Sequence, residues 1–245
     1  MAHRLAAAAI SKHLPGSLHS MLAGETGFQP RHAPRGTVLV RENDMADHSI
    51  LLLEGWLALS KTLPSGDVQI IDLMLPGDFA LIGTQMVPVA ATTVEALSNI
   101  RYVHISPDQV NGSGSALARL RHVLAACILT TQSRTSELLL RLGRGTAANR
   151  IAYALLEVYT RLQAVGLTTG TIFEFPITQQ KLGEFTGMTN VHVCRTLRRF
   201  EADGLIRHPD NQRIELMDLP ALCALADIDI DRLRDEILIR WPLPA

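Results

Sequence analysis

The sequence predicts an α+β protein with a β-rich N-terminal part, a long central helix and a C-terminal helix-turn-helix that carries a β-hairpin wing. Up to about residue 107, short apolar segments alternate with turn residues, which is typical of a sandwich or barrel. From there to about residue 142, apolar residues recur every three or four positions, which indicates a helix. Beyond it, two short helical patterns joined by a glycine precede a hairpin pattern. We expect the three parts at residues 1–112, 113–143 and 144–245.

The composition is that of an ordinary soluble protein. The chain has 245 residues, a formal net charge of −1, 47% hydrophobic residues and 19% charged residues. Its apolar runs are far shorter than the ~20 residues of a membrane-spanning helix, and we find no signal-peptide pattern, so we expect a cytoplasmic protein without a membrane partner. Cys127, Cys194 and Cys223 are widely separated, which predicts neither a zinc site nor a disulfide framework.

Turn residues divide the β-rich part into short strands. The apolar segments 49–53 and 56–60 are separated by a Glu-Gly pair, and a Pro-Ser-Gly-Asp turn at 64–67 precedes the next segment. Pro76-Gly77-Asp78 closes that segment, and another apolar segment follows at 100–105. Because turns favour proline, glycine and aspartate, we expect each apolar segment to be one strand.

The long predicted helix carries a stripe of apolar and small residues. Such a stripe suits a helix that pairs with a second helix, and it suits equally a helix packed on its own domain. Two threonines in the middle weaken a coiled coil, although their hydroxyl groups could face a ligand. The members of the stripe are Leu117, Leu120, Leu124, Ile128, Thr131, Thr135, Leu138 and Leu142.

The segment 177–200 has the pattern of a helix-turn-helix. Thr178 is a good N-cap for a short first helix, and Gly187 supplies the left-handed residue that ends it. Thr189 then caps a second helix, in which Val193, Leu197 and Phe200 form the inward face. The segment 205–216 has a turn-rich centre between two strand patterns, which predicts a hairpin, the wing of a winged helix.

The outer face of the second helix predicts binding to double-stranded DNA. A recognition helix places its N-terminal residues against base edges, and Arg195, one turn into the helix, can contact the O6 and N7 atoms of guanine. Helix N-termini, hydroxyls and amides suit phosphates. Arg198 and Arg199 are expected at phosphates, or in one case at a carboxylate such as Glu201. The alternative interpretation is that these arginines only form a solvent-exposed face of the helix and bind nothing. The predicted DNA-binding residues are Thr178, Gln179, Thr189, Asn190, Val191, His192, Arg195, Thr196 and Arg199.

With these motifs the chain resembles the CRP/FNR superfamily of bacterial regulators over nearly its whole length. The resemblance rests on Pro76-Gly77-Asp78, the long helix, the Asn-Arg-Ile-Ala run at 149–152 and the winged helix-turn-helix. Its most specific part is the Val-His-Val-Cys-Arg-Thr-Leu run at 191–197, similar to a branch common in alphaproteobacteria. The resemblance implies a cyclic-nucleotide-binding-like β-jelly-roll, a dimerisation helix at 113–143, and a homodimer that binds a palindromic operator and contacts RNA polymerase.

This sequence lacks the residues with which well-known members of the superfamily bind cyclic AMP. Members that bind cyclic AMP use a Gly-Glu pair and an Arg-Ser pair, whereas residues 79–83 contain no Glu and Ala90-Ala91-Thr92 stands in place of Arg-Ser-Ala. A cyclic phosphate would therefore find no cation. Thr135-Ser136 matches the pair that meets adenine, which leaves open a cyclic-nucleotide-responsive regulator with a non-standard pocket. The predicted effector-pocket residues are Gly77, Asp78, Thr131, Thr135 and Ser136.

We predict no cofactor and no metal site. The first cysteine is Cys127, so the N-terminal four-cysteine iron–sulfur cluster of FNR-type members is excluded. We interpret His48, His104 and His122 as structural or surface residues rather than haem ligands. Cys194 lies on the predicted recognition helix, where oxidation would add bulk and charge beside DNA. The simpler interpretation of Cys194 is a small residue packed on that helix.

Val191 stands where many members of the superfamily place a Glu that accepts from cytosine N4. Valine cannot accept a hydrogen bond, although it can touch a thymine methyl group, so the half-site should differ at that base pair while Arg195 still requires a guanine.

An enzyme with a winged-helix accessory domain is disfavoured, because the β part has no paired carboxylates, P-loop or nucleophile elbow. A scaffold whose winged helix binds protein is the other alternative. The β-rich part either senses an unidentified effector or is constitutive.

Overall fold

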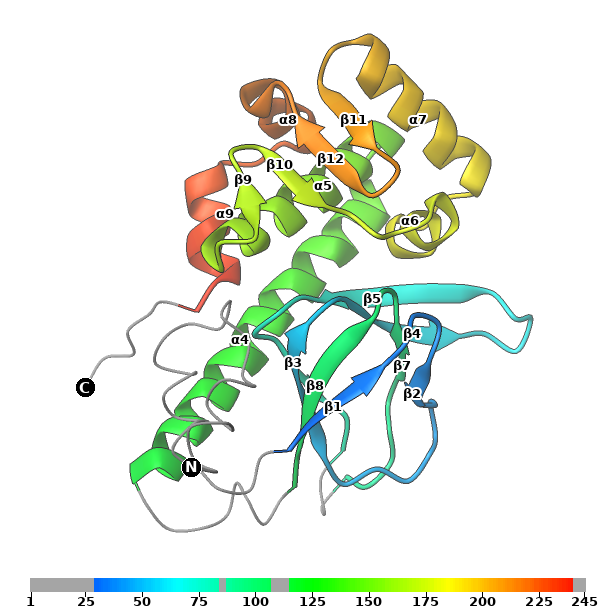
Figure 1. Cartoon of the computed structure of the whole chain (residues 1–245). Coiled ribbons are helices and arrows are strands. Elements are labelled where there is room, and N and C mark those ends of the chain that lie inside the picture. The colour runs from blue at the N-terminus through cyan, green and yellow to red at the C-terminus, as the bar shows by residue number, and fades with distance from the viewer. Residues whose placement is uncertain (1–28, 84–86, 107–114, 240–245) are drawn as a thin grey trace. The chain divides into compact units, whose positions relative to one another are not determined.

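The computed structural model describes residues 29–83, 87–106 and 115–239 (Figure 1). These residues form two compact units. Of the described residues, unit one contains 29–61 and those between Leu73 and Leu129. Unit two contains Thr62–Asp72 and Thr130–Leu238. The boundary between the units therefore falls inside the central helix, and the hairpin at Thr62–Asp72 belongs by its contacts to unit two.

Unit one is built on an antiparallel β-roll, as the alternation of apolar segments and turns predicts. The strands of the roll lie in two four-stranded sheets, in the orders β1-β8-β3-β6 and β2-β7-β4-β5, among the described residues, although most of β5 belongs by its contacts to unit two. The strands are β1 (Pro30–Ala33), β2 (Val38–Val40), β3 (Ser49–Glu54), β4 (Leu57–Thr62), β5 (Val68–Met74), β6 (Phe79–Leu81), β7 (Thr93–Ala96) and β8 (Ile100–Ile105).

The continuous apolar run of β3 lies at the centre of this roll. Ile50, Leu51, Leu52 and Leu53 are all 0% exposed. Successive side chains of a strand point to opposite faces, so β3 is buried on both faces and needs no polar alternation. The predicted turn at Asp78 is also present, because its carboxylate accepts the N–H of Leu75 at 2.7 Å.

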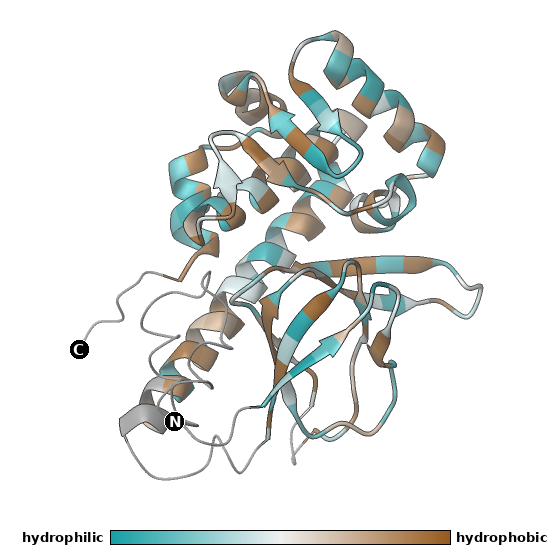
Figure 2. Ribbon diagram, viewed as in Figure 1, coloured by the Kyte–Doolittle hydropathy of each residue, from teal (hydrophilic) through white to brown (hydrophobic). Residues whose placement is uncertain are grey.

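Helix α4 (Ser115–Arg144) is the predicted long helix, and hydrophobic patches recur along it (Figure 2). The predicted stripe divides into two sets. Leu120 and Leu138 are 2% and 5% exposed, so they pack within the chain and are not available to a second helix. Ile128 and Thr135 are exposed. The side chain of Leu117 lies outside the described residues.

Unit two surrounds helix α5 (Ala147–Ala164), whose side chains from Ile151 to Leu162 are buried on all sides. A sheet in the order β11-β12-β10-β9 and four further helices pack around it. The sequence predicted α6, α7 and the wing, but not β9, α8 or α9. The further elements are β9 (Thr168–Thr169), β10 (Ile172–Glu174), α6 (Gln179–Thr186), α7 (Asn190–Ala202), β11 (Ile206–Asp210), β12 (Arg213–Leu216), α8 (Leu219–Ala226) and α9 (Ile230–Ile237).

A buried charge cluster in unit two was not predicted from the sequence. Asp72 of β5 accepts from Arg134 of α4 through both carboxylate oxygens, at 3.2 and 2.7 Å. Arg161 of α5 lies 3.9 Å from Asp72 and donates to Glu157 at 2.8 Å. All four side chains are at most 6% exposed. Burial raises the pKa of Glu157, with Asp72 adding to that shift and Arg161 opposing it.

Candidate nucleic-acid interface

The two short helices of the predicted helix-turn-helix begin and end where the sequence indicates. The hydroxyl oxygen of Thr178 accepts the N–H of Lys181 at 3.2 Å, and that of Thr189 accepts the N–H of His192 at 3.4 Å. Both threonines therefore satisfy N–H groups that the first turn of a helix leaves unpaired. Gly187 ends α6 with φ 64°, a left-handed conformation that favours glycine.

Helix α7 has one buried face and one exposed face, as predicted. Val193, Leu197 and Phe200 are 0%, 7% and 1% exposed. The hydroxyl of Thr196 donates to the carbonyl of His192 at 2.9 Å, and this side chain is only partly exposed. The other predicted contact residues are exposed: Thr178, Gln179, Thr189, Asn190, Val191, His192, Arg195 and Arg199.

The arginines of α7 differ in their ion pairing. Arg199 lies 3.4 Å from the carboxylate of Asp203, one helical turn further on. Its partner is thus Asp203 rather than Glu201, which accepts from His208 of the wing at 2.6 Å. Within the described part of the chain, neither Arg195 nor Arg198 has a carboxylate partner. Those two guanidinium groups are therefore the ones most available to an external anion or base edge.

The wing carries arginines, but its own carboxylates pair with them. Arg207 donates to Glu215 at 2.8 Å, and Arg213 donates to Asp210 at 2.7 Å. The backbone N–H of Gln212 and the guanidinium of Arg213 hold the pKa of Asp210 below its ordinary value. The wing is therefore close to neutral, which the sequence analysis did not predict.

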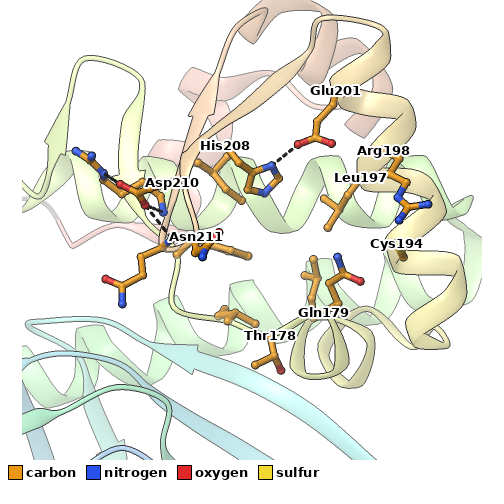
Figure 3. Close-up of a pocket in the computed structure, with 15 residues that line it drawn as sticks. Thr178, Gln179, Cys194, Leu197, Arg198, Glu201, His208, Asp210 and Asn211 are labelled. Carbon is orange, nitrogen blue, oxygen red and sulfur yellow. Dashed lines mark hydrogen bonds and ion pairs between the residues drawn. The ribbon is translucent and has the colours of Figure 1, made fainter.

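A cleft of about 470 Å³ lies between the start of α6, the length of α7 and the wing (Figure 3). Its apolar lining includes Phe175, Leu182 and Ile214. Cys194 and Arg198 line it from α7. Cys194 is partly exposed, and its oxidation near DNA stays a prediction. No sequence signal identified this cleft, because its walls come from three separate segments.

The predicted effector-pocket residues are distributed over both units. Asp78 and Gly77 form the turn in unit one described above, where Gly77 also donates its N–H to the carbonyl of Leu52 at 2.9 Å. In unit two, the hydroxyl of Thr131 accepts from Arg134 at 3.1 Å, and that of Thr135 donates to the carbonyl of Thr131 at 2.9 Å. Ser136 is exposed. None of the five lines the cleft beside α7, and the effector pocket stays a prediction.

The histidines considered as haem ligands have different surroundings. His48 and His104 stack in the β-roll with ring centroids 4.2 Å apart, while His122 is exposed on α4. Among the described residues, no group of three His, Cys, Asp or Glu side chains is placed to hold a metal ion. No described helix combines the length and the apolar character that crossing a membrane requires.

Two family models match separate stretches of the chain. A model of the cyclic nucleotide-binding domain matches residues 30–112. A model of the Crp-like helix-turn-helix domain matches residues 149–225. The second match contains α6, α7 and the wing, so the elements of the candidate interface all lie inside it.

Relatives with known names match most of the chain. The transcriptional activator protein FnrA of Stutzerimonas stutzeri is 26% identical over 199 residues, or 80% of each chain. The nitrogen fixation regulation protein FixK of Azorhizobium caulinodans is 27% identical over 188 residues, covering 77% of this chain and 75% of that protein. Among solved structures, FixK2 from Bradyrhizobium japonicum has a TM-score of 0.70 at 23% identity, over 81% of this chain and 96% of its own. A CRP-family regulator from Thermus thermophilus has a TM-score of 0.67 at 21% identity, covering 82% of this chain and 98% of its own. The two structures share the fold.

Proposed function

We propose that this DNA-binding transcription regulator belongs to the CRP/FNR family and recognises a palindromic operator as a homodimer, with α7 as the recognition helix. The observation that carries this proposal is the exposed guanidinium of Arg195, which has no carboxylate partner among the described residues. It lies one turn after the N-terminus of a capped helix. That is the place from which a recognition helix contacts base edges.

The remaining contacts follow from position and chemistry. Arg195 binds the O6 and N7 atoms of a guanine. Val191, whose side chain is 65% exposed, touches a thymine methyl group. Asn190 and His192 contact bases or phosphates at the tip of the helix. Phosphates are bound by the N-terminal ends of α6 and α7, with Thr178, Gln179 and Thr189, and by Thr196 and Arg199 further along α7. The Val-His-Val-x-Arg-Thr-Leu run supports membership of the alphaproteobacterial-type branch.

The second copy of the chain packs along α4. The side chains of Ala125, Ile128, Gln132, Thr135 and Leu139 recur at intervals of three and four residues and are all exposed. Ile128 and Leu139 are 50% and 69% exposed, which is unusual for apolar residues at such spacing unless another helix covers them. This stripe replaces the one that includes Leu120 and Leu138, which are already buried in the same chain.

The protein acts on transcription in the cytoplasm, without enzymatic activity, and RNA polymerase is its further partner. The relatives FnrA and FixK, named as an activator and a regulatory protein, support this proposal. The match of the β-roll to the cyclic nucleotide-binding domain favours a second candidate, a regulator that binds a cyclic nucleotide near Thr135 and Ser136. Against it, Ala90 is 0% exposed and offers no cation.

Selection from a pool of randomised DNA duplexes tests the proposal. The purified full-length protein should enrich a palindrome with one required guanine in each half-site. A protein-binding scaffold or an enzyme would enrich no sequence. Enrichment of an asymmetric sequence would contradict the homodimer while leaving the DNA-binding role of α7 in place.

A further inference from the structure

The turn between α6 and α7 is held by side chains from outside the helix-turn-helix. The last carbonyl groups of a helix have no partner within that helix. In α6, the carbonyl of Phe185 accepts from the side-chain amide of Gln69 at 3.0 Å. The carbonyls of Thr186 and Gly187 accept from Arg150 of α5, each at 3.3 Å. Two side chains from distant parts of the sequence therefore cap this end of α6.

The same side chains contact the turn itself. A β-carbon added to Gly187 would lie 2.8 Å from the side chain of Leu142, 3.4 Å from Arg150 and 3.8 Å from the amide oxygen of Gln69. The turn is thus in close contact with the end of α4, the start of α5 and strand β5. A displacement of any of the three would alter the direction in which α7 leaves the turn.

Gln69 itself is held firmly on β5. Its amide nitrogen also donates to the carbonyl of Ile70 at 2.8 Å. Three residues later on the same strand, Asp72 makes its two hydrogen bonds to Arg134 of α4. The segment Thr62–Asp72 is therefore anchored in unit two at two points, although the strands that flank it continue into the β-roll.

We propose that Gln69 is a positioning residue for DNA recognition, which holds the turn so that α7 presents Arg195 at the correct angle. The inference rests on the proposed role of Arg195 in base recognition. Base contacts require side chains placed to within about 0.5 Å, whereas attraction to phosphates tolerates larger displacements. Gln69 therefore acts on the discrimination between DNA sequences, and it does so from a hairpin that precedes α6 by more than a hundred residues in the chain.

The test compares the wild type with Gln69→Glu, which has the same shape but places an acceptor against the Phe185 carbonyl. Gln29→Glu makes the same chemical change at an exposed side chain before β1 and is the matched control. Gln69→Ala removes the contact without adding a charge. Fluorescence anisotropy measures affinity for the duplex that the wild type enriches and for a random duplex of equal length. Hydrogen exchange at residues 186–190 is measured without DNA.

We expect Gln69→Glu to lower affinity for the enriched duplex about tenfold, since one hydrogen bond is lost and a repulsion added. Affinity for the random duplex should stay within about twofold, because the charges of α7 are intact. Exchange of the Met188 amide, which donates to Gly183 at 3.0 Å, should accelerate. Gln69→Ala should likewise lower affinity for the enriched duplex and accelerate exchange of the Met188 amide, with little change on the random duplex, and Gln29→Glu should match the wild type.

Unchanged affinity in both Gln69 variants would overturn the proposal. So would equal losses on both duplexes accompanied by a lower Tm, because that pattern belongs to a residue that only stabilises the fold. If the wild type enriches no duplex, the proposed role of Arg195 in base recognition fails. The exchange measurement then still decides whether Gln69 holds the turn.

Discussion

At the scale of single residues, Arg195 and Arg199 carry the same charge on the exposed side of α7 but differ in what surrounds them. Arg199 already has the Asp203 carboxylate at 3.4 Å. Arg195 has no carboxylate partner among the residues that the structure describes. A guanidinium that is free before binding can adopt the planar, two-pronged geometry of a guanine contact without first breaking an ion pair.

Replacing Arg195 by alanine should cost about 1–3 kcal/mol of binding free energy on the enriched duplex. The loss should nearly vanish on a duplex whose required guanine is already replaced, because the contact is made to that base. Titration of both duplexes checks this. Arg199→Ala is the control and should weaken binding to both duplexes alike. The same uniform loss in Arg195→Ala would identify Arg195 as a phosphate contact.

His104 gives the β-roll a dependence on pH. Burial, the neighbouring His48 and Arg31 lower the pKa of His104 from 6.5 to about 4. Between pH 6.5 and 4 the unfolded chain therefore binds a proton that the folded chain does not, and stability falls as the pH falls through this window. The Tm of His104→Gln should decrease less between pH 7 and 4.5 than that of the wild type. His32→Gln, at an exposed position of β1, should behave as the wild type does. An equal decrease in all three proteins would contradict this assignment.

At the scale of elements, the buried charge cluster joins β5, α4 and α5. Asp72 supplies the carboxylate that balances Arg134 and lies near Arg161. A buried ion cluster is weak evidence for stability in itself, because removing charges from water is costly. Removing only one member of the cluster is strongly destabilising, because a remaining buried charge then loses its counter-ion. The cluster thus favours one arrangement of the three elements over others.

Asp72→Asn should lower the free energy of unfolding by about 3–5 kcal/mol, the usual cost of breaking one side of a buried ion pair. Denaturation in urea measures the loss. The control is Asp67→Asn, which makes the same change at an exposed turn residue bonded to Ser65 and should alter stability by less than about 0.5 kcal/mol. Comparable stability of the two variants would show that Arg134 and Arg161 are compensated in some other way.

At the scale of the whole molecule, the proposed homodimer depends on the exposed stripe of α4. Leu139→Glu places a charge in the exposed stripe of α4, where a second helix would have to bury it without a partner. The variant should be monomeric by sedimentation equilibrium and should bind one half-site instead of the full palindrome. Leu63→Glu changes another exposed leucine, 63% accessible, and should remain dimeric. A dimeric Leu139→Glu protein would place the interface elsewhere.

The sequence predicted the local features of the helix-turn-helix accurately, but it did not predict which side of α4 is buried in the same chain. Thr178, Thr189 and Gly187 could be identified because N-caps and left-handed turn residues act on groups a few positions away. The sequence could not separate the residues of the α4 stripe that are buried in the same chain from those that are exposed. A three- and four-residue spacing identifies an apolar side of a helix, but it does not say whether Leu138 or Leu139 faces the same chain.

The order of the β-rich part, the long helix and the winged helix-turn-helix, the two faces of α7 and the exposure of Arg195 all followed from local patterns of the sequence, because each depends on residues that lie close together in the chain. The meeting of Asp72, Arg134 and Arg161 and the capping of α6 by Gln69 became visible in the folded structure alone. Those contacts join residues separated by up to 116 positions. No local spacing encodes them, because they form only when the apolar faces of several elements have packed together.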